Sequence, residues 1–412
     1  MEELFSKSVE ELNLFCKFTE EEMKILENAD KAAEEMAMPE YEHYLKHEFN
    51  HEATEIAAKY GLLGIPIKKE YGGSGSRPII STLAKERLGQ LGMGFSSFFN
   101  VQVFLCAQTI QRWGTEEQKK TYLPQAVKKD KIFAFGLTEP EAGSDPSSLK
   151  TEYEKKGDKY ILNGTKYLIS NGTIADYLII FARSKEKEIG NGSTSKISTF
   201  IVDAKSSGIE RTALREKIGL FTSDTGMIDL DNVEVNKECA IGELGKGLPI
   251  AYSALLNARL GVASGCVGVI EAALNAVINR SKERVQFGKP IGRHQLIQQH
   301  ISAIRQNLEM ARWPTYFAAI RKGEYEENPN NKDLLKEIDL RVSLAKRISS
   351  RLAFESADHA VQVFGGFGYS LLSPVGQLFC DSRVTRIYEG TDEIQDLKIA
   401  SSLLGKDFEA YA

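Results

Sequence analysis

The stretch Ile132-Phe133-Ala134-Phe135-Gly136-Leu137 marks the place where the pattern of apolar residues changes. Before it, apolar residues recur at three- and four-residue spacing, as on one face of an α-helix. After it, short alternating runs are separated by turns rich in Gly, Asn and Asp, as between β-strands. From Gly245 onward the helical spacing returns. The order of elements along the 412 residues is therefore predicted to be helices, strands, helices.

This order predicts an α+β multidomain fold. Residues 1–130 are predicted to form an N-terminal α-helical domain. Regularly spaced short strands in residues 131–242 predict a compact antiparallel, barrel-like middle domain. Long helical segments with short connections in residues 243–412 predict a C-terminal four-helix bundle.

Composition narrows the class of protein. The chain is 42% apolar and 26% charged, as in ordinary soluble proteins, and its net charge of −5 argues against binding to nucleic acid or to an anionic membrane. No apolar run approaches the length that crosses a bilayer, and the acidic N-terminus lacks the features of a secretory signal or a transit peptide. A cytoplasmic protein is predicted. The five cysteines are scattered without a CxxC pair, which predicts reduced thiols and no metal site.

Five segments could carry chemistry. Residues 135–145 run from a strand into a Gly-containing turn, where backbone N–H groups and hydroxyls can hold an anion or the polar edge of a ring. Residues 166–171 end another strand on a hydroxyl and an Asn. Residues 284–291 place an Arg beside a Gly, which suits a phosphate, and residues 362–369 contain paired glycines that permit close backbone approach. Residues 386–391 hold Glu389 between a Tyr and a Gly-Thr turn.

Each segment taken alone is explained as well by an ordinary strand end, a capped helix or a solvated loop. None of the Gly clusters matches G-x-G-x-x-G after a strand, which argues against a Rossmann site. In combination, however, the chain resembles an acyl-CoA dehydrogenase over nearly its whole length. The stretches that carry the resemblance, in order, are Glu70-Tyr71-Gly72-Gly73, Trp113-Gly114-Thr115-Glu116-Glu117-Gln118, residues 137–145, residues 284–291, residues 362–366 and Ile387-Tyr388-Glu389-Gly390-Thr391.

The resemblance implies a fold, a cofactor and a reaction. The family has the same order of helical, β and helical domains, and it binds FAD between the β domain and the bundle. It converts a saturated acyl-CoA to the trans-2-enoyl-CoA and passes electrons to an electron-transferring flavoprotein. Glu389 matches the base that takes the α-proton while flavin N5 takes the β-hydride, and burial would raise its pKa and its basicity. The backbone N–H of this Glu and a ribityl hydroxyl stabilise the thioester oxygen.

The resemblance also assigns binding residues. Phe135, Leu137, Thr138 and Ser144 match contacts to the flavin or the acyl thioester, Ser170 matches the hydroxyl that bonds flavin N5, and Leu168 stands where the family often has a shielding Trp. Thr391 and Glu393 match cofactor contacts after the base. The substrate contacts are Ser144, Arg259, Tyr388 and Gly390. The residues that match contacts to the adenosine-diphosphate part of FAD in a neighbouring subunit, and so imply a dimer or a tetramer built as a dimer of dimers, are Arg284, Gln286, Phe287, Gln295, Gln362 and Gly366.

Three alternatives stay open. Leu168 leaves room for an acyl-CoA oxidase, and a dehydrogenase of acyl groups on carrier proteins uses the same scaffold. A non-enzymatic flavoprotein that binds nucleic acid is argued against by the acidic net charge.

Ala258 cannot serve as the base that some branches carry at that position, which favours Glu389. The absence of Arg in residues 94–97 argues against glutaryl-CoA, and the length and branching of the acyl group are left open.

Overall fold

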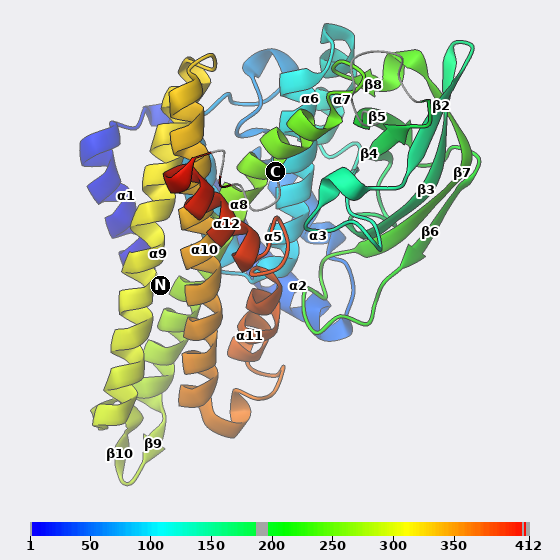
Figure 1. The fold of residues 1–412 in the computed structure, drawn as a ribbon. Coiled ribbons are helices and arrows are strands. Elements are labelled where there is room, and N and C mark those ends of the chain that lie inside the picture. Colours follow the sequence, from blue (N-terminus) through cyan, green and yellow to red (C-terminus); the bar gives the residue numbers. More distant parts are fainter. Residues whose placement is uncertain (1, 187–196, 406–407, 409–412) are drawn as a thin grey trace.

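The computed structural model describes residues 2–186, 197–405 and 408 (Figure 1). Helices fill the first part of the chain. Thr19 and Thr115 each begin a helix with a capping box, the second of which the sequence predicted. One segment is a π-helix, a form with wider turns that often accompanies functional sites. The helical elements are α1 (Glu2–Cys16), α2 (Glu20–Lys46), α3 (His51–Lys59), η1 (Leu62–Gly64), η2 (Lys69–Tyr71), α4 (Pro78–Gly89), α5 (Met93–Phe99), the π-helix η3 (Asn100–Ala107), α6 (Gln108–Trp113) and α7 (Glu116–Val127).

The middle of the chain forms a mixed sheet whose strands follow the order β6-β7-β3-β2-β4-β5-β8, with β1 paired to β4. Neighbouring strands are antiparallel except β1 with β4 and β2 with β4, which are parallel. The strands are β1 (Phe133–Gly136), β2 (Glu152–Lys156), β3 (Lys159–Ser170), β4 (Tyr177–Ser184), β5 (Ile197–Asp203), β6 (Ile209–Ala213), β7 (Thr225–Asn236) and β8 (Ala240–Ile241), and short 3-10 turns follow β1 and β7 at η4 (Pro146–Ser148) and η5 (Lys237–Cys239).

The C-terminal part is a bundle of three long helices and a fourth that is split in two. The long helices are α8 (Gly247–Glu283), α9 (Gln295–Glu327) and α10 (Lys332–Phe364), and the split one consists of α11 (Pro374–Val384) and α12 (Asp392–Leu404). The turn between α11 and α12 splits this helix and carries Glu389, next to the Gly390-Thr391 turn that the sequence indicated. The connections contain the hairpin β9 (Val285–Gln286) and β10 (Lys289–Pro290), with η6 (Ile291–Arg293) and η7 (Gly365–Phe367).

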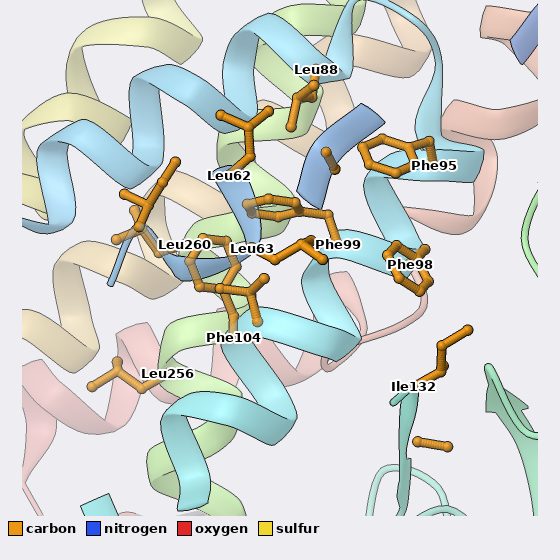
Figure 2. Close-up of a cluster of buried hydrophobic side chains, with 14 of the residues drawn as sticks. Leu62, Leu63, Leu88, Phe95, Phe98, Phe99, Phe104, Ile132, Leu256 and Leu260 are labelled. Carbon is orange, nitrogen blue, oxygen red and sulfur yellow. The ribbon is translucent and has the colours of Figure 1, made fainter. Parts of the chain in front are cut away.

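Helix α8 lies at the centre of the packing. It contacts α9 and α10 of the bundle and α4 and η3 of the N-terminal part. Figure 2 shows Leu256 and Leu260 of α8 in one buried cluster with Phe99 and Phe104. By length and composition α8 is apolar enough to cross a membrane, which the sequence reading overlooked, but 78% of its most apolar window is buried inside the protein. That burial is expected of the core helix of a soluble protein.

Two buried carboxyl groups join the three parts of the chain. Asp381 of α11 accepts hydrogen bonds from the backbone N–H groups of Met93 (3.0 Å) and Leu220 (2.6 Å). Glu40 of α2 accepts from the Thr222 hydroxyl and from Asn50 Nδ2 (2.8 Å). Because buried polar groups are costly unless they are paired, these bonds fix the loop before β7 against both helical parts. The predicted fold class, with helical, β and helical parts, is confirmed (Figure 1). The sheet differs from the predicted antiparallel one in that β4 pairs in parallel with β1 and β2.

Candidate active site

A cavity of about 1740 Å³ lies between the sheet and the bundle. Its lining comes from strand ends of β1 and β3, from the loop before β7, and from α8, α10, α11 and α12. Sites for one small ligand usually measure ~300–1,000 Å³. The cavity therefore has room for a large cofactor together with a substrate.

The turn between α11 and α12 brings Glu389 into this cavity. Glu389 has φ +55° and Gly390 has φ +96°, so two consecutive residues adopt the left-handed region. Gly does so without strain, whereas a non-Gly residue there is uncommon and often marks a functional position. The two residues end the helical path and turn the carboxylate inward.

Polar contacts from three helices hold this turn. Arg259 Nε of α8 donates to the Glu389 carbonyl oxygen at 2.9 Å, and Lys346 Nζ of α10 donates to the Gly390 carbonyl oxygen at 2.7 Å. Within the turn, Arg386 Nε pairs with Asp392 at 2.7 Å, at the first residue of α12. The backbone that carries Glu389 is thus fixed by side chains far from it in the sequence.

The environment of Glu389 changes the acidity of its carboxyl group. Its side chain is half-buried because it faces the cavity, and burial raises the pKa of its carboxyl group to about 7. Arg259, Lys346 and a hydrogen bond from Asn100 Nδ2 (3.3 Å) oppose that rise. A carboxyl group with this pKa is a stronger base than an exposed Glu, yet is still largely ionised slightly above neutral pH.

Other side chains on the lining of this cavity suit a flat ring with a polar edge. Phe135 and Leu137 give apolar surface, and hydroxyls come from Thr138, Ser144 and Ser170. The flavin ring of FAD has such faces and edges, so these residues fit it.

A register shift in β3, between Lys166 and Ile169, gives Leu168 φ +55° and leaves 56% of this residue exposed, at the cavity.

Among the residues that the structure describes, none accepts a hydrogen bond from the backbone N–H of Glu389, which leaves that donor available to a ligand. The bulge and this N–H lie on the lining of the same cavity.

The structure separates the predicted site residues into two groups. Those that line the cavity are Phe135, Leu137, Thr138, Ser144, Leu168, Ser170, Arg259, Tyr388, Glu389, Gly390 and Thr391. Glu393 is exposed on α12 and is not part of the lining. The other six lie exposed around the hairpin and the adjoining ends of α9 and α10, at the end of the bundle away from the cavity: Arg284, Gln286, Phe287, Gln295, Gln362 and Gly366.

Sequence reasoning missed several residues that act on the site. Lys346 occupies a buried position among Val342, Ala345 and Ser349 of α10, and a lysine on an apolar helix face is a signal that could have found it. Asn100 gave no such signal, because its contact with Glu389 spans 289 residues of sequence.

Comparisons with known proteins agree with this arrangement. The sequence models for the N-terminal, middle and C-terminal domains of acyl-CoA dehydrogenases match residues 19–130, 134–233 and 245–404. An acyl-CoA dehydrogenase of Bacillus subtilis is 37% identical over 87% of this chain and 91% of its own length.

Two further relatives bear on partner and cofactor. A caffeyl-CoA reductase-Etf complex subunit of Acetobacterium woodii is 36% identical over 87% of this chain and 91% of its own length. The crystal structure of an acyl-CoA dehydrogenase complexed with FAD from Bacillus anthracis superposes with a TM-score of 0.87 at 30% identity, covering 96% of this chain and 68% of that one.

Proposed function

The chain belongs to the acyl-CoA dehydrogenase family of FAD-dependent oxidoreductases, and from that premise we propose its reaction and its residues. The reaction is the α,β-dehydrogenation of a saturated acyl-CoA to the trans-2-enoyl-CoA, with Glu389 as the base. The observation that carries the proposal is the Glu389 carboxylate, which lines the cavity and has its pKa raised to about 7 by burial.

Each protein group has a defined task in this reaction. The Glu389 carboxylate takes the α-proton of the acyl group, and the electron pair of that C–H bond forms the double bond as the β-hydride leaves. FAD supplies the acceptor for that hydride. The backbone N–H of Glu389 donates to the thioester oxygen, where negative charge develops as the proton departs. Phe135 and Leu137 give the lining apolar surface that would keep water away from the reacting carbons.

The remaining site residues hold the ligands. Thr138, Ser144, Ser170 and Thr391 would hold FAD through their hydroxyls, and Tyr388, Ser144, Arg259 and Gly390 border the acyl thioester. Glu393 lies outside the lining, and we retain it only as a contact at the edge of the cofactor site.

The reaction predicts a pH dependence. We expect the rate of flavin reduction by an acyl-CoA to fall as the pH drops through about 7. Below its pKa the Glu389 carboxyl group already holds a proton and cannot take another, whereas above its pKa it is ionised and active. Anaerobic stopped-flow measurements of flavin bleaching across this range test it, and a flat profile would contradict the assignment of Glu389.

We also propose that FAD is shared between subunits. The residues matched to its adenosine-diphosphate part lie far from the cavity of their own chain and are exposed, so a second copy must bring them to the cofactor. The assembly is then a dimer, or a tetramer as a dimer of dimers.

Arg284→Ala is expected to weaken FAD binding by about 10-fold to 100-fold, since a charge-assisted hydrogen bond is worth ~1.5–3 kcal/mol. Fluorescence titration of the FAD-free protein measures this. Arg293→Ala changes an exposed Arg on the neighbouring 3-10 turn and serves as the control. Equal affinities in both variants would refute the role of Arg284.

The central experiment is an anaerobic scan of saturated acyl-CoAs of different length and branching, with bleaching of the flavin as the readout. No bleaching with any of them would overturn the proposal. Comparing the turnover of an acyl-CoA with that of the same acyl group on a carrier protein distinguishes an acyl-CoA dehydrogenase from the carrier-protein alternative.

We further propose a cytoplasmic location and an electron-transferring flavoprotein as acceptor, as in the complex named for the Acetobacterium relative.

A second candidate, an acyl-CoA oxidase, is favoured by Leu168. Leu168 is smaller than the Trp that the family often has at this position, and more than half of it is exposed at the cavity. It would therefore leave a path for oxygen to a bound flavin. Peroxide release in air at the rate of substrate oxidation, without another acceptor, would identify an oxidase. Substrate oxidation that needs the flavoprotein acceptor would identify a dehydrogenase.

A further inference from the structure

Asn100 makes a direct contact with the proposed base. Its Nδ2 donates to Glu389 Oε1 at 3.3 Å, across 289 residues of sequence. Asn100 is buried, with 4% of its surface exposed, and it is the first residue of the π-helix η3. Its amide oxygen Oδ1 has no hydrogen-bond partner in the part of the chain that the structure describes.

The basic side chains around Glu389 use their donors elsewhere. Arg259 of α8 donates to the Glu389 carbonyl oxygen, Lys346 of α10 to the Gly390 carbonyl oxygen, and Lys85 of α4 to the Ser96 hydroxyl at 2.9 Å and to the Ser96 carbonyl oxygen. Each of these side chains acts on the Glu389 carboxylate only through its charge, and burial lowers the pKa of Lys85 to about 7 and that of Lys346 to about 8.

The other titratable groups that face Glu389 are neutral. Burial raises the pKa of the Cys106 thiol on η3 and of the Tyr388 hydroxyl well above their usual values. Within the described residues, Asn100 is therefore the side chain that bonds the carboxylate directly.

The packing leaves a place for this amide. Gly261 of α8 faces Asn100, and a Cβ added there would lie 2.2 Å from Asn100 Oδ1 and 2.6 Å from the Phe104 ring. Any larger residue would push the amide away from Glu389. Asn100 itself has regular helical backbone angles (φ −59°, ψ −46°) and stands where α5 passes into the π-helix η3.

We propose that Asn100 is a positioning residue, whose amide holds the Glu389 carboxylate in place for proton transfer and reverses its hydrogen bond once the carboxylate has taken the proton. An ionised carboxylate only accepts hydrogen bonds, whereas a protonated one also donates. A terminal amide offers NH₂ to the first and, after rotation by half a turn, its oxygen to the second. The role rests on the proposed function of Glu389 and adds to it a partner that is neutral in both states.

The test is a direct titration of Glu389 in Asn100 variants. Infrared spectroscopy of the purified holoenzyme follows the C=O band of the protonated carboxyl, identified as the band that Glu389→Gln removes. Asn100→Leu removes the donor to the ionised form, so we expect the midpoint to rise by about 1 pH unit. Asn100→Asp has the same shape and replaces the donor with a second carboxylate, and it should raise the midpoint further.

Two more variants separate positioning from general damage. Asn100→Ser keeps a group that donates and accepts, and should restore part of the shift. Gln102→Leu removes another buried amide of η3, which bonds Ala126, Lys131 and Phe133 and does not contact Glu389. It should lower stability without moving the midpoint.

The outcomes separate this inference from the proposed function. A shift in Asn100→Leu or Asn100→Asp with none in Gln102→Leu supports the positioning role. An unchanged midpoint in both Asn100 variants, or an equal shift in Gln102→Leu, overturns it, even where the wild-type flavin is bleached by acyl-CoA. Failure of the wild type to bleach with any acyl-CoA overturns the function instead, and leaves the infrared titration of Glu389 readable.

Discussion

Glu389→Gln is expected to slow flavin reduction by an acyl-CoA by ~10²–10⁴-fold, the usual contribution of a positioned general base. Gln has nearly the same shape as Glu and keeps the turn and its anchors from Arg259 and Lys346, but its amide cannot take the α-proton. The purified variant should therefore remain yellow. Anaerobic stopped-flow absorbance with the best substrate of the wild type measures the loss.

The control for this variant is Glu234→Gln. Glu234 is an exposed carboxylate on β7, paired with Lys159, and lies outside the cavity lining. Its replacement should leave the rate of bleaching unchanged. If Glu389→Gln were reduced as fast as this control, the proton would be leaving to another group and the proposed mechanism would be wrong.

Arg312→Met is expected to lower the free energy of unfolding by ~3–5 kcal/mol, the range found when one partner of a buried ion pair is removed. Arg312 of α9 lies in the core, where its guanidinium bonds Glu86 of α4 (Nε 3.0 Å, Nη2 2.6 Å), Glu271 of α8 and the Ser8 hydroxyl of α1 (2.8 Å). Without Arg312, the carboxyl groups of Glu86 and Glu271 remain buried without the guanidinium that bonds both of them. Denaturant titration of the FAD-saturated protein measures the loss.

The loss should depend on pH. Burial already raises the pKa of Glu271 to about 7 although Arg312 lowers it, and burial also raises the pKa of Glu86. Removing Arg312 raises both further. A carboxyl group whose pKa is higher in the folded than in the unfolded protein stabilises the folded state below the unfolded pKa. This contribution to stability is lost as the pH rises through the pKa of the folded protein. Below about pH 7 Glu271 keeps its proton in both folded proteins, so the deficit of Arg312→Met should grow mainly as the pH rises above about 7, where the wild-type carboxyl ionises and that of the variant does not.

Arg321→Met on the same helix is the matched control. Arg321 pairs with Glu324 and Glu337 nearer the surface, where its side chain is 26% exposed, and such pairs contribute ~0–1 kcal/mol. Equal losses in the two variants would mean that the buried cluster contributes no more than a surface pair.

Much of the architecture follows from local sequence. The change of period at Ile132, the return of helical spacing at Gly245 and the capping box at Thr115 each depend on residues a few positions apart. The ordered motifs were enough to identify the family and its cofactor, FAD. The site was less accessible: the sequence located the turn at Glu389 through resemblance, and its spacing alone fits a solvated loop as well.

By itself, the sequence determined the order of helices and strands, the helix caps and the family, because such patterns record interactions between near neighbours in the chain. Tertiary structure alone decided that Glu389 adopts a left-handed conformation, that Leu168 lies on a bulge, and that Asn100 bonds the Glu389 carboxylate. The contacts of Glu389 with Asn100 and Arg259 span 289 and 130 residues. Only the packing of η3, α8 and α10 around one turn brings such distant groups within hydrogen-bond distance, and no local period encodes it.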